Sequence, residues 1–192
     1  MNVSREQATQ NRERIVETAA QQFRERGFDG IGVADLMKAA GLTHGGFYGH
    51  FSSKEDLIAE ASARALLRSF AICVKVAERA PRDPLSAVAD AYLTSRHRDT
   101  PGEGCVLAAL GPDVSRQGPA VRRTVTDHVR SAVDLFATVV PGRSKAARRK
   151  KAISNVSHIG GHDGYGARRR CSCAVTGNPR CRCDVCQSLI PL

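Results

Sequence analysis

Apolar residues recur at helical spacing along most of this chain, and this pattern restricts the fold more than any other feature of the sequence. In the segment Gln7–Arg26, five apolar side chains fall on one face of a helix: Ile15, Val16, Ala19, Ala20 and Phe23. Later segments repeat the pattern, and none shows the alternation of apolar and polar residues that a half-buried strand requires. The sequence therefore predicts an all-α fold.

Glycine, threonine and proline residues divide this pattern into separate helices. Gly27 is suited to end a helix, Thr43 is suited to cap one, and Pro81 and Pro84 interrupt a long one. We expect helices over Gln7–Arg26, Val33–Ala40, His44–Phe51, a long stretch from Leu57 to Ala77, Leu85–Leu93, Val106–Val114, Pro119–Val140 and Ser144–Ser157. Beyond His158, four residues should prevent any helix: Gly160, Gly161, Gly164 and Gly166.

The charge of the chain is unevenly distributed. The 192 residues carry a formal net charge of +10, but residues 1–60 hold 7 Lys and Arg against 9 Asp and Glu. Residues 143–192 hold 11 against 2, so an argument from basic charge to nucleic-acid binding applies only there.

No apolar run approaches the roughly 20 residues of a membrane span, and the N-terminal residues lack the apolar core of a secretory signal. We therefore expect a cytoplasmic protein with no membrane partner.

Two short helices joined by a glycine turn follow a longer first helix, which is the order of a helix-turn-helix. The residues here are specific in type and spacing: Gly27, Phe28, Asp29, Gly30, Val33, Leu36, Ala39, Ala40, Gly41, Leu42, Thr43, Gly46, Phe47, Tyr48, Gly49, His50, Phe51, Lys54, Glu55 and Leu57. The pattern closely resembles the DNA-binding domain of the TetR family of transcriptional regulators. The resemblance implies a three-helix DNA-binding domain at residues 1–54 and a helical ligand-binding and dimerisation domain at residues 55–157.

The resemblance also assigns roles to individual positions. Base-contacting positions are His44, Gly45 and Gly46, and phosphate-contacting positions are Thr43, Tyr48, His50 and Lys54. Residues without a side chain let the backbone approach base edges, and each glycine costs a helix about 1 kcal/mol that a purely structural helix would avoid. Taken singly, Tyr48 also fits half-buried packing and His50 an ordinary surface role, whereas Phe47 and Phe51 are expected in the core. The implied partner is double-stranded operator DNA.

The second domain of this family is a dimer element that binds a small apolar effector, and effector binding weakens the grip on DNA. Candidate effector contacts are Phe70, Tyr92, Cys105, Leu107, Leu110 and Phe136, although each also fits a plain core role. We therefore predict a homodimeric, ligand-released repressor that uses no cofactor. No Ser/His/Asp or paired-carboxylate pattern indicates an enzyme. The alternative is a thiol- or metal-responsive regulator acting through Cys105 or the C-terminal cysteines. Cys105 follows a glycine-rich segment but has no basic neighbour in the sequence.

Residues 158–192 differ in character from the rest of the chain. They contain five crowded cysteines: Cys171, Cys173, Cys181, Cys183 and Cys186. Such spacing is compatible with zinc or thiol sensing. A one-base reading-frame slip near Ser157 explains more, because cysteine codons read from their second base encode only Val or Ala. The shifted frame would be apolar, as the family's last, dimer-forming helices are. We therefore expect an aberrant tail that impairs the dimer, and we assign no metal site.

Overall fold

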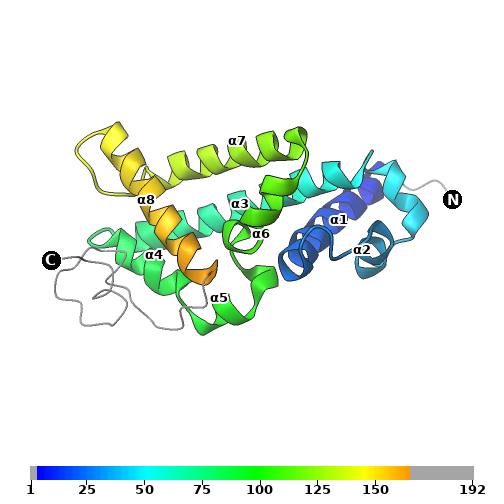
Figure 1. The fold of residues 1–192 in the computed structure, drawn as a ribbon, viewed down its shortest axis with the longest axis horizontal. Helices are drawn as coiled ribbons and strands as arrows, with labels where there is room; N and C mark the ends of the chain where they lie inside the picture. Colours follow the sequence, from blue (N-terminus) through cyan, green and yellow to red (C-terminus); the bar gives the residue numbers. More distant parts are fainter. Residues whose placement is uncertain (1–3, 165–192) are drawn as a thin grey trace. The chain divides into compact units, whose positions relative to one another are not determined.

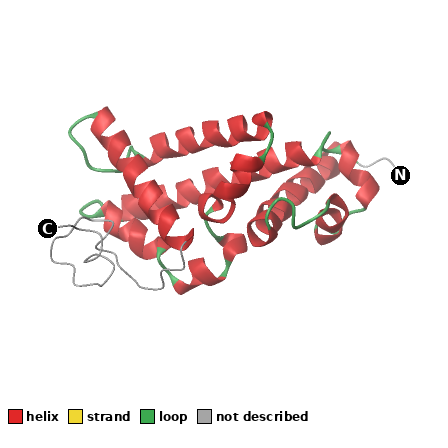
Figure 2. Ribbon diagram, viewed as in Figure 1, coloured by secondary structure: helices red, strands yellow, loops and turns green. Residues whose placement is uncertain are grey.

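The fold was examined in a computed structural model that describes residues 4–164. Within this range every regular element is a helix, as Figure 2 shows, which confirms the all-α prediction. The longer elements are α1 (Arg5–Arg26), α3 (Lys54–Arg79), α6 (Val106–Arg116), α7 (Pro119–Phe136) and α8 (Lys145–Gly164). The shorter ones are α2 (Val33–Ala39), α4 (Pro84–Tyr92), α5 (Ser95–Asp99) and two 3₁₀ helices, η1 (His44–Gly49) and η2 (Pro101–Glu103). Figure 1 labels the α-helices in chain order.

The helix boundaries differ from most of the predicted ones by a few residues, and α5 was not predicted. The larger differences concern η1, α7 and α8. The segment His44–Gly49 winds as a 3₁₀ helix, because two successive glycines weaken the longer α-helical hydrogen-bond ladder. Helix α7 ends at Phe136 rather than Val140. Helix α8 continues to Gly164, so the prediction that Gly160 and Gly161 prevent a helix is wrong. Glycine lowers helix propensity, but unlike proline it keeps its N–H and can stay in the ladder.

The chain divides into two compact units. The first comprises the chain up to Arg68 together with Thr100–Val129, and the second comprises Ser69–Asp99 together with the chain from Arg130 onward. The first unit therefore takes in η2 and α6, which lie well beyond the helix-turn-helix in sequence. The boundary predicted between residues 54 and 55 stays a prediction.

The first unit has an apolar core built on the predicted face of α1. All five residues of that face are buried, together with residues from α2, η1 and α3: Ile15, Val16, Ala19, Ala20, Phe23, Leu36, Met37, Phe47 and Leu57. Phe23 meets Phe28 edge to face, with ring centroids 5.4 Å apart. Figure 1 shows α1 beside the first part of α3. Burial of these large side chains holds the helices of this unit together.

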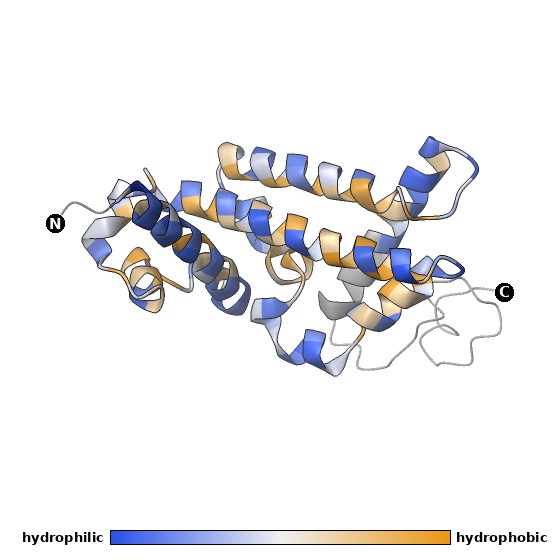
Figure 3. Cartoon of the chain, turned by 180° about the vertical axis from the view of Figure 1, so that it is seen from behind, coloured by the Kyte–Doolittle hydropathy of each residue, from blue (hydrophilic) through white to orange (hydrophobic). Residues whose placement is uncertain are grey.

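The second unit has its own core. Phe70 of α3 packs edge-on against Phe136 of α7, with ring centroids 6.5 Å apart. Leu85 and Val88 of α4 are also buried. Figure 3 shows apolar and polar residues on different faces of the helices, as amphipathic packing requires.

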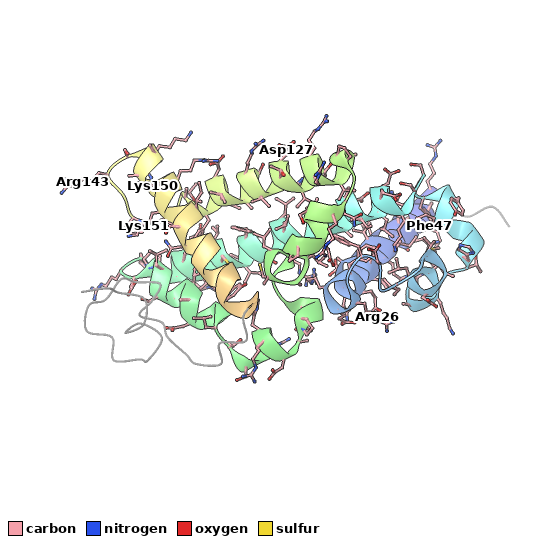
Figure 4. The ribbon with its side chains drawn as sticks, in the orientation of Figure 1. Arg26, Phe47, Asp127, Arg143, Lys150 and Lys151 are labelled. Atoms are coloured by element: carbon pink, nitrogen blue, oxygen red, sulfur yellow. The ribbon has the colours of Figure 1, made fainter. Side chains whose placement is uncertain are left out.

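Helix α8 begins with a basic, solvent-exposed stretch. Arg143, Lys150 and Lys151 are exposed and labelled in Figure 4. Arg149 is paired with Asp134 of α7 at 2.7 Å. Among residues 4–164, no helix combines the length and the apolar character that crossing a bilayer requires.

The segment that precedes α6 is fastened to the C-terminal half of α1. Gly102 is buried, and its carbonyl oxygen accepts hydrogen bonds from two nitrogens of the Arg24 guanidinium, Nε and Nη2, the first at 2.8 Å. Burial lowers the pKa of Arg24, because the charged guanidinium loses part of its hydration. Two residues distant in sequence are thereby joined within the first unit.

Candidate nucleic-acid interface

A tight glycine turn separates α2 from η1. Gly41 has a positive φ of 67°, a conformation that side-chain-bearing residues rarely adopt. Immediately after it, the backbone N–H of Leu42 donates to the carbonyl of Met37 at 2.8 Å, which closes the end of α2. The chain then reaches η1, whose orientation is set by this turn and by its own buried side chains.

One face of η1 is anchored in the core of the first unit. Phe47 is fully buried and stacks on Phe51, with ring centroids 5.6 Å apart and ring planes inclined by 28°. Phe51, two residues beyond η1, is also buried. The two phenylalanines therefore take the core positions that the sequence predicted for them. Figure 4 labels Phe47 among the side chains of the N-terminal helices.

The residues of η1 beside Phe47 are turned to solvent. Tyr48 is 67% exposed, although its ring touches Phe47 edge to face at a centroid distance of 5.3 Å. His44 is exposed, with its ring 6.3 Å from that of Tyr48. An exposed aromatic hydroxyl and an exposed imidazole both offer hydrogen-bonding groups to an external partner. The half-buried packing role that the residue type alone allowed for Tyr48 is not the one it has.

The glycines of η1 have no structural reason to be glycine. Gly45 and Gly49 are exposed, and a Cβ built on either would meet no other atom within 4 Å. A Cβ on Gly46 would make only ordinary contacts, 3.6 Å from the Thr43 Oγ1 and 3.7 Å from the Met37 Cε. None of the three has a positive φ. Neither backbone conformation nor internal packing therefore explains why side chains are missing here.

Gly49 was not among the DNA-contacting positions predicted from sequence. In a 3₁₀ helix, residues three apart lie above one another, so Gly46 and Gly49 share a face of η1. That relation depends on the 3₁₀ winding, which the sequence did not predict. Once the winding is known, Gly49 becomes a further candidate DNA-contacting position beside His44, Gly45 and Gly46, whose role stays a prediction.

The remaining candidate phosphate contacts flank η1. Thr43 is exposed and is the N-cap residue of η1, as predicted, but its side chain accepts no capping hydrogen bond. Its hydroxyl is correspondingly available to other donors and acceptors. His50 and Lys54 are half-buried, and Lys54 is the first residue of α3. The cap of α3 is provided by Ser53, whose Oγ accepts from the backbone N–H of Asp56 at 3.1 Å.

A cation from α1 lies against the aromatic pair that anchors η1. The Cζ atom of Arg12 is 4.6 Å from the centroid of the Phe51 ring. The same guanidinium donates to both carboxylate oxygens of Glu60 in α3, with Nη2 to Oε2 at 2.7 Å. Glu60 raises the pKa of Arg12, chiefly through this hydrogen bonding. No local pattern predicts this arrangement, because the two residues are 48 positions apart.

The candidate effector contacts fall into two groups. Phe70, Tyr92 and Phe136 belong to the second unit, where Phe70 and Phe136 are buried against each other. The other three belong to the first unit, with Leu110 buried and Cys105 and Leu107 half-buried: Cys105, Leu107 and Leu110. Their role in effector binding stays a prediction.

Cysteine and metal chemistry can be located only in part. Cys105 is the N-cap residue of α6, and Arg24 is close enough for the two groups to interact electrostatically. The fold therefore supplies the basic neighbour that the local sequence lacks. Among the side chains that the structure describes, residues 4–155, no three His, Cys, Asp or Glu residues gather into a group that could hold a metal ion. The five tail cysteines and the predicted frame slip concern a segment that lies largely outside the described residues.

The helices that contain the candidate interface match a known protein family. Residues 15–61 match the family model described as "Bacterial regulatory proteins, tetR family". Through this segment, the chain belongs to the TetR family. The matched residues of this TetR-family chain include the buried face of α1, all of α2 and η1, and the start of α3.

Curated relatives of this TetR-family protein are named as transcriptional regulators. The HTH-type transcriptional regulator AcrR of Shigella flexneri is 28% identical over 90 residues, which are 47% of this chain and 42% of that protein. The HTH-type transcriptional repressor DhaR of Mycobacterium sp. (strain GP1) is 28% identical over 111 residues, 58% of this chain and 56% of that protein. The chain thus spans about half the length of the curated relatives it matches.

Solved structures extend the likeness to the remaining helices. A TetR-family transcriptional regulator from Cytophaga hutchinsonii aligns with a TM-score of 0.73 at 20% identity, covering 92% of this chain and 94% of that one. At this identity the likeness concerns the fold, and it shows that the helices after α3 follow a TetR-family arrangement.

Proposed function

We propose that this TetR-family chain binds duplex DNA through η1 and regulates transcription in the cytoplasm, as a repressor that a small apolar ligand releases. The observation that carries the proposal is the exposed, glycine-lined surface of η1. Gly45 and Gly49 lack side chains for no internal reason, so the reason lies in a partner that must come close to the backbone. The major groove of DNA is such a partner, because recognition helices read base edges there.

The same surface indicates how the affinity would be divided. With two glycines beside His44, few side chains are available to read bases directly. Tyr48 and Lys54 would contribute contacts to the sugar-phosphate backbone, which position the protein without selecting a sequence. Selectivity would then depend on His44 and on the shape of the duplex. Residues 1–60 hold 7 basic against 9 acidic residues, so long-range attraction to DNA is small and local contacts must dominate.

The proposal is tested by offering the full chain a random library of duplexes together with the region upstream of its own gene. Selection followed by a mobility shift should give a defined sequence bound at least 1,000-fold more tightly than unrelated duplex, within the range typical of specific regulators. Tyr48→Ala should fold normally but bind the selected duplex more weakly, because Tyr48 is exposed and its removal leaves Phe47 in place. Failure of the wild-type chain to enrich any sequence would overturn the proposal.

Release by a ligand requires that the effector-binding helices influence the DNA-binding helices. The bond from Arg24 to Gly102 supports such coupling, because it ties α1 to the segment that leads into α6. A ligand that changes this segment would alter α1, and the coupling free energy would appear as weaker DNA binding. A screen of small apolar compounds for dissociation of the selected duplex tests this part. Sedimentation of the complex tests the expected homodimer.

The arrangement around Cys105 favours a second candidate function, a regulator that responds to thiol modification. Cys105 caps α6, and Arg24 interacts with it electrostatically. Reactive cysteines often lie beside a positive charge or at the start of a helix. N-ethylmaleimide, which alkylates thiols, should then release the wild-type protein from DNA but spare Cys105→Ser. Cys73→Ser is the matched control, since Cys73 is also a half-buried cysteine within the described part of the chain.

A further inference from the structure

Two ion pairs connect α1 to α3, and they differ in what lies beneath them. Arg12 of α1 pairs with Glu60 of α3, and Glu17 of α1 pairs with Arg68 of α3. The second pair is the more exposed, with 66% and 55% of its side chains accessible against 42% and 31% for the first. Among the residues that the structure describes, only the first pair has an aromatic ring in contact with its guanidinium, that of Phe51.

The contacts of Arg12 continue from Phe51 into η1. Phe51 stacks on Phe47, and Phe47 meets Tyr48 edge to face. The backbone N–H of Phe51 also donates to the carbonyl of Phe47 at 3.0 Å. A displacement of the Phe51 ring would therefore be passed to the buried anchor of η1 and to its exposed tyrosine.

The geometry of the guanidinium suits it to fixing an orientation. Two parallel hydrogen bonds to Glu60 hold the planar group in one rotation about its axis. Its Cζ atom lies over the Phe51 ring, whose negative face attracts a cation. A lysine would retain the charge but not the two-pronged hydrogen bonding. We propose that Arg12, held by Glu60, is a positioning residue that sets the orientation of η1 for DNA recognition.

This inference rests on the proposed function, but part of it can be measured without DNA. Amide hydrogen exchange of the full-length protein should speed up at residues 47–51 in Arg12→Met, which keeps an apolar stem and loses the charged fork. The expected increase is at least fivefold. Exchange at the same amides should stay at the wild-type rate in the control Arg68→Met, which removes the other α1–α3 ion pair.

The second measurement is affinity for the duplex that wild-type protein selects from a random library, taken well below the melting temperature of each variant. Arg12→Met and Glu60→Gln should each weaken binding at least tenfold, and the double variant should lose little more than either alone, since both break the same contact. Arg12→Lys should recover only part of the loss. A residue with a purely structural role would lower the melting temperature without changing the affinity of the folded protein.

The dependence of affinity on salt separates positioning from direct contact with DNA. If Arg12 orients η1, the slope of log affinity against log salt stays at the wild-type value in every variant. If Arg12 itself neutralised a phosphate, Arg12→Met would reduce the slope by about one unit, and Glu60→Gln would leave affinity unchanged or raise it; either result overturns the inference. Unchanged amide exchange in Arg12→Met overturns it as well. Absence of any duplex selected by wild-type protein overturns the proposed function, and the positioning role with it.

Discussion

The Nε of Arg24 donates a hydrogen bond of 2.8 Å to the carbonyl oxygen of Gly102, 78 residues further along the chain. Gly102 is buried, and a Cβ at this position would lie 2.9 Å from the Cγ of Gln21 on α1. The backbone of Gly102 thus packs closely against the side chains of α1. Helix α1 is therefore hydrogen-bonded to a segment that lies 78 residues further along the chain.

Removing the Arg24 guanidinium should destabilise the protein. Arg24→Met leaves the carbonyl of buried Gly102 without its charged partner, which costs about 1–3 kcal/mol. Arg26→Met is the matched control, because Arg26 is exposed in the same last turn of α1. Urea unfolding of the two variants measures the difference. Equal losses would show that the bond to Gly102 contributes nothing beyond the favourable position of a cation at the helix end.

Adding methyl groups to η1 should separate DNA binding from stability. Gly45→Ala and Gly49→Ala encounter no other atom of the protein, so unfolding free energies should change by no more than about 1 kcal/mol, the difference in helix propensity. Affinity for a selected duplex should fall at least tenfold, because the backbone can no longer approach. Thermal unfolding and mobility shifts check both arms. Undiminished DNA binding in both variants would contradict the close-approach role.

Gly30 should behave in the opposite way. A Cβ at this position would overlap the main-chain carbonyl of Arg26, and it would lie 2.9 Å from the carbon of that carbonyl. Because backbone must shift to admit it, Gly30→Ala should lose about 1–3 kcal/mol of stability. Gly32→Ala, where a Cβ meets nothing within 4 Å, serves as the control. It should lose less, about 0.5–1 kcal/mol, because Gly32 is the N-cap residue of α2 and alanine is a poorer cap than glycine. Similar unfolding curves for the two variants would argue against this packing.

A phosphate contact by Lys54 should be detectable in the salt dependence of DNA affinity. If its ammonium group neutralises one phosphate, Lys54→Gln should reduce the slope of log affinity against log salt by about one unit. Affinity should fall to a similar degree on every duplex tested, since phosphates carry no base identity. Lys75→Gln, at an exposed position later in α3, should leave the slope as it is. Titrations by fluorescence anisotropy at several salt concentrations give these slopes, and an unaltered slope for Lys54→Gln would remove it from the interface.

The contribution of Arg12 to stability should not change across the neutral range. Glu60 raises the pKa of Arg12 in the folded protein. A base with a raised folded-state pKa contributes stability that is present below its unfolded-state pKa and is lost only as pH rises through the folded value, here in strongly alkaline solution. The unfolding free energies of wild type and Arg12→Gln should therefore differ by a constant amount between about pH 7 and pH 9. Urea titrations at several pH values check this, and a difference that shrinks within that range would contradict it.

Much of the fold follows from local pattern. The buried face of α1 was predicted in full, because a repeat near 3.6 residues reports directly which side of a helix is covered. The core positions of Phe47 and Phe51 were predicted for the same reason. The 3₁₀ winding of η1 was not, since it depends on a balance between hydrogen-bond ladders that differ little in energy.

The contacts that fix the candidate site could not be predicted. Arg12 and Glu60 are 48 residues apart, and Arg24 and Gly102 are 78 apart. Neither pair produces a repeat or a motif, because each depends on how whole helices cross. The continuation of α8 through Gly160 and Gly161 has another reason: the helical state of a segment depends on all its residues, so the low propensity of two glycines does not end it.

The open space around Gly45 and Gly49 has a consequence for how such a protein can change over time. A core residue such as Phe47 is constrained by the residues packed around it, whereas positions 45 and 49 are constrained only by an external binding partner. New side chains could be introduced at 45 and 49 while the scaffold stays intact. A lineage built on this frame could thus acquire altered target preferences one substitution at a time, without first passing through an unfolded ancestor.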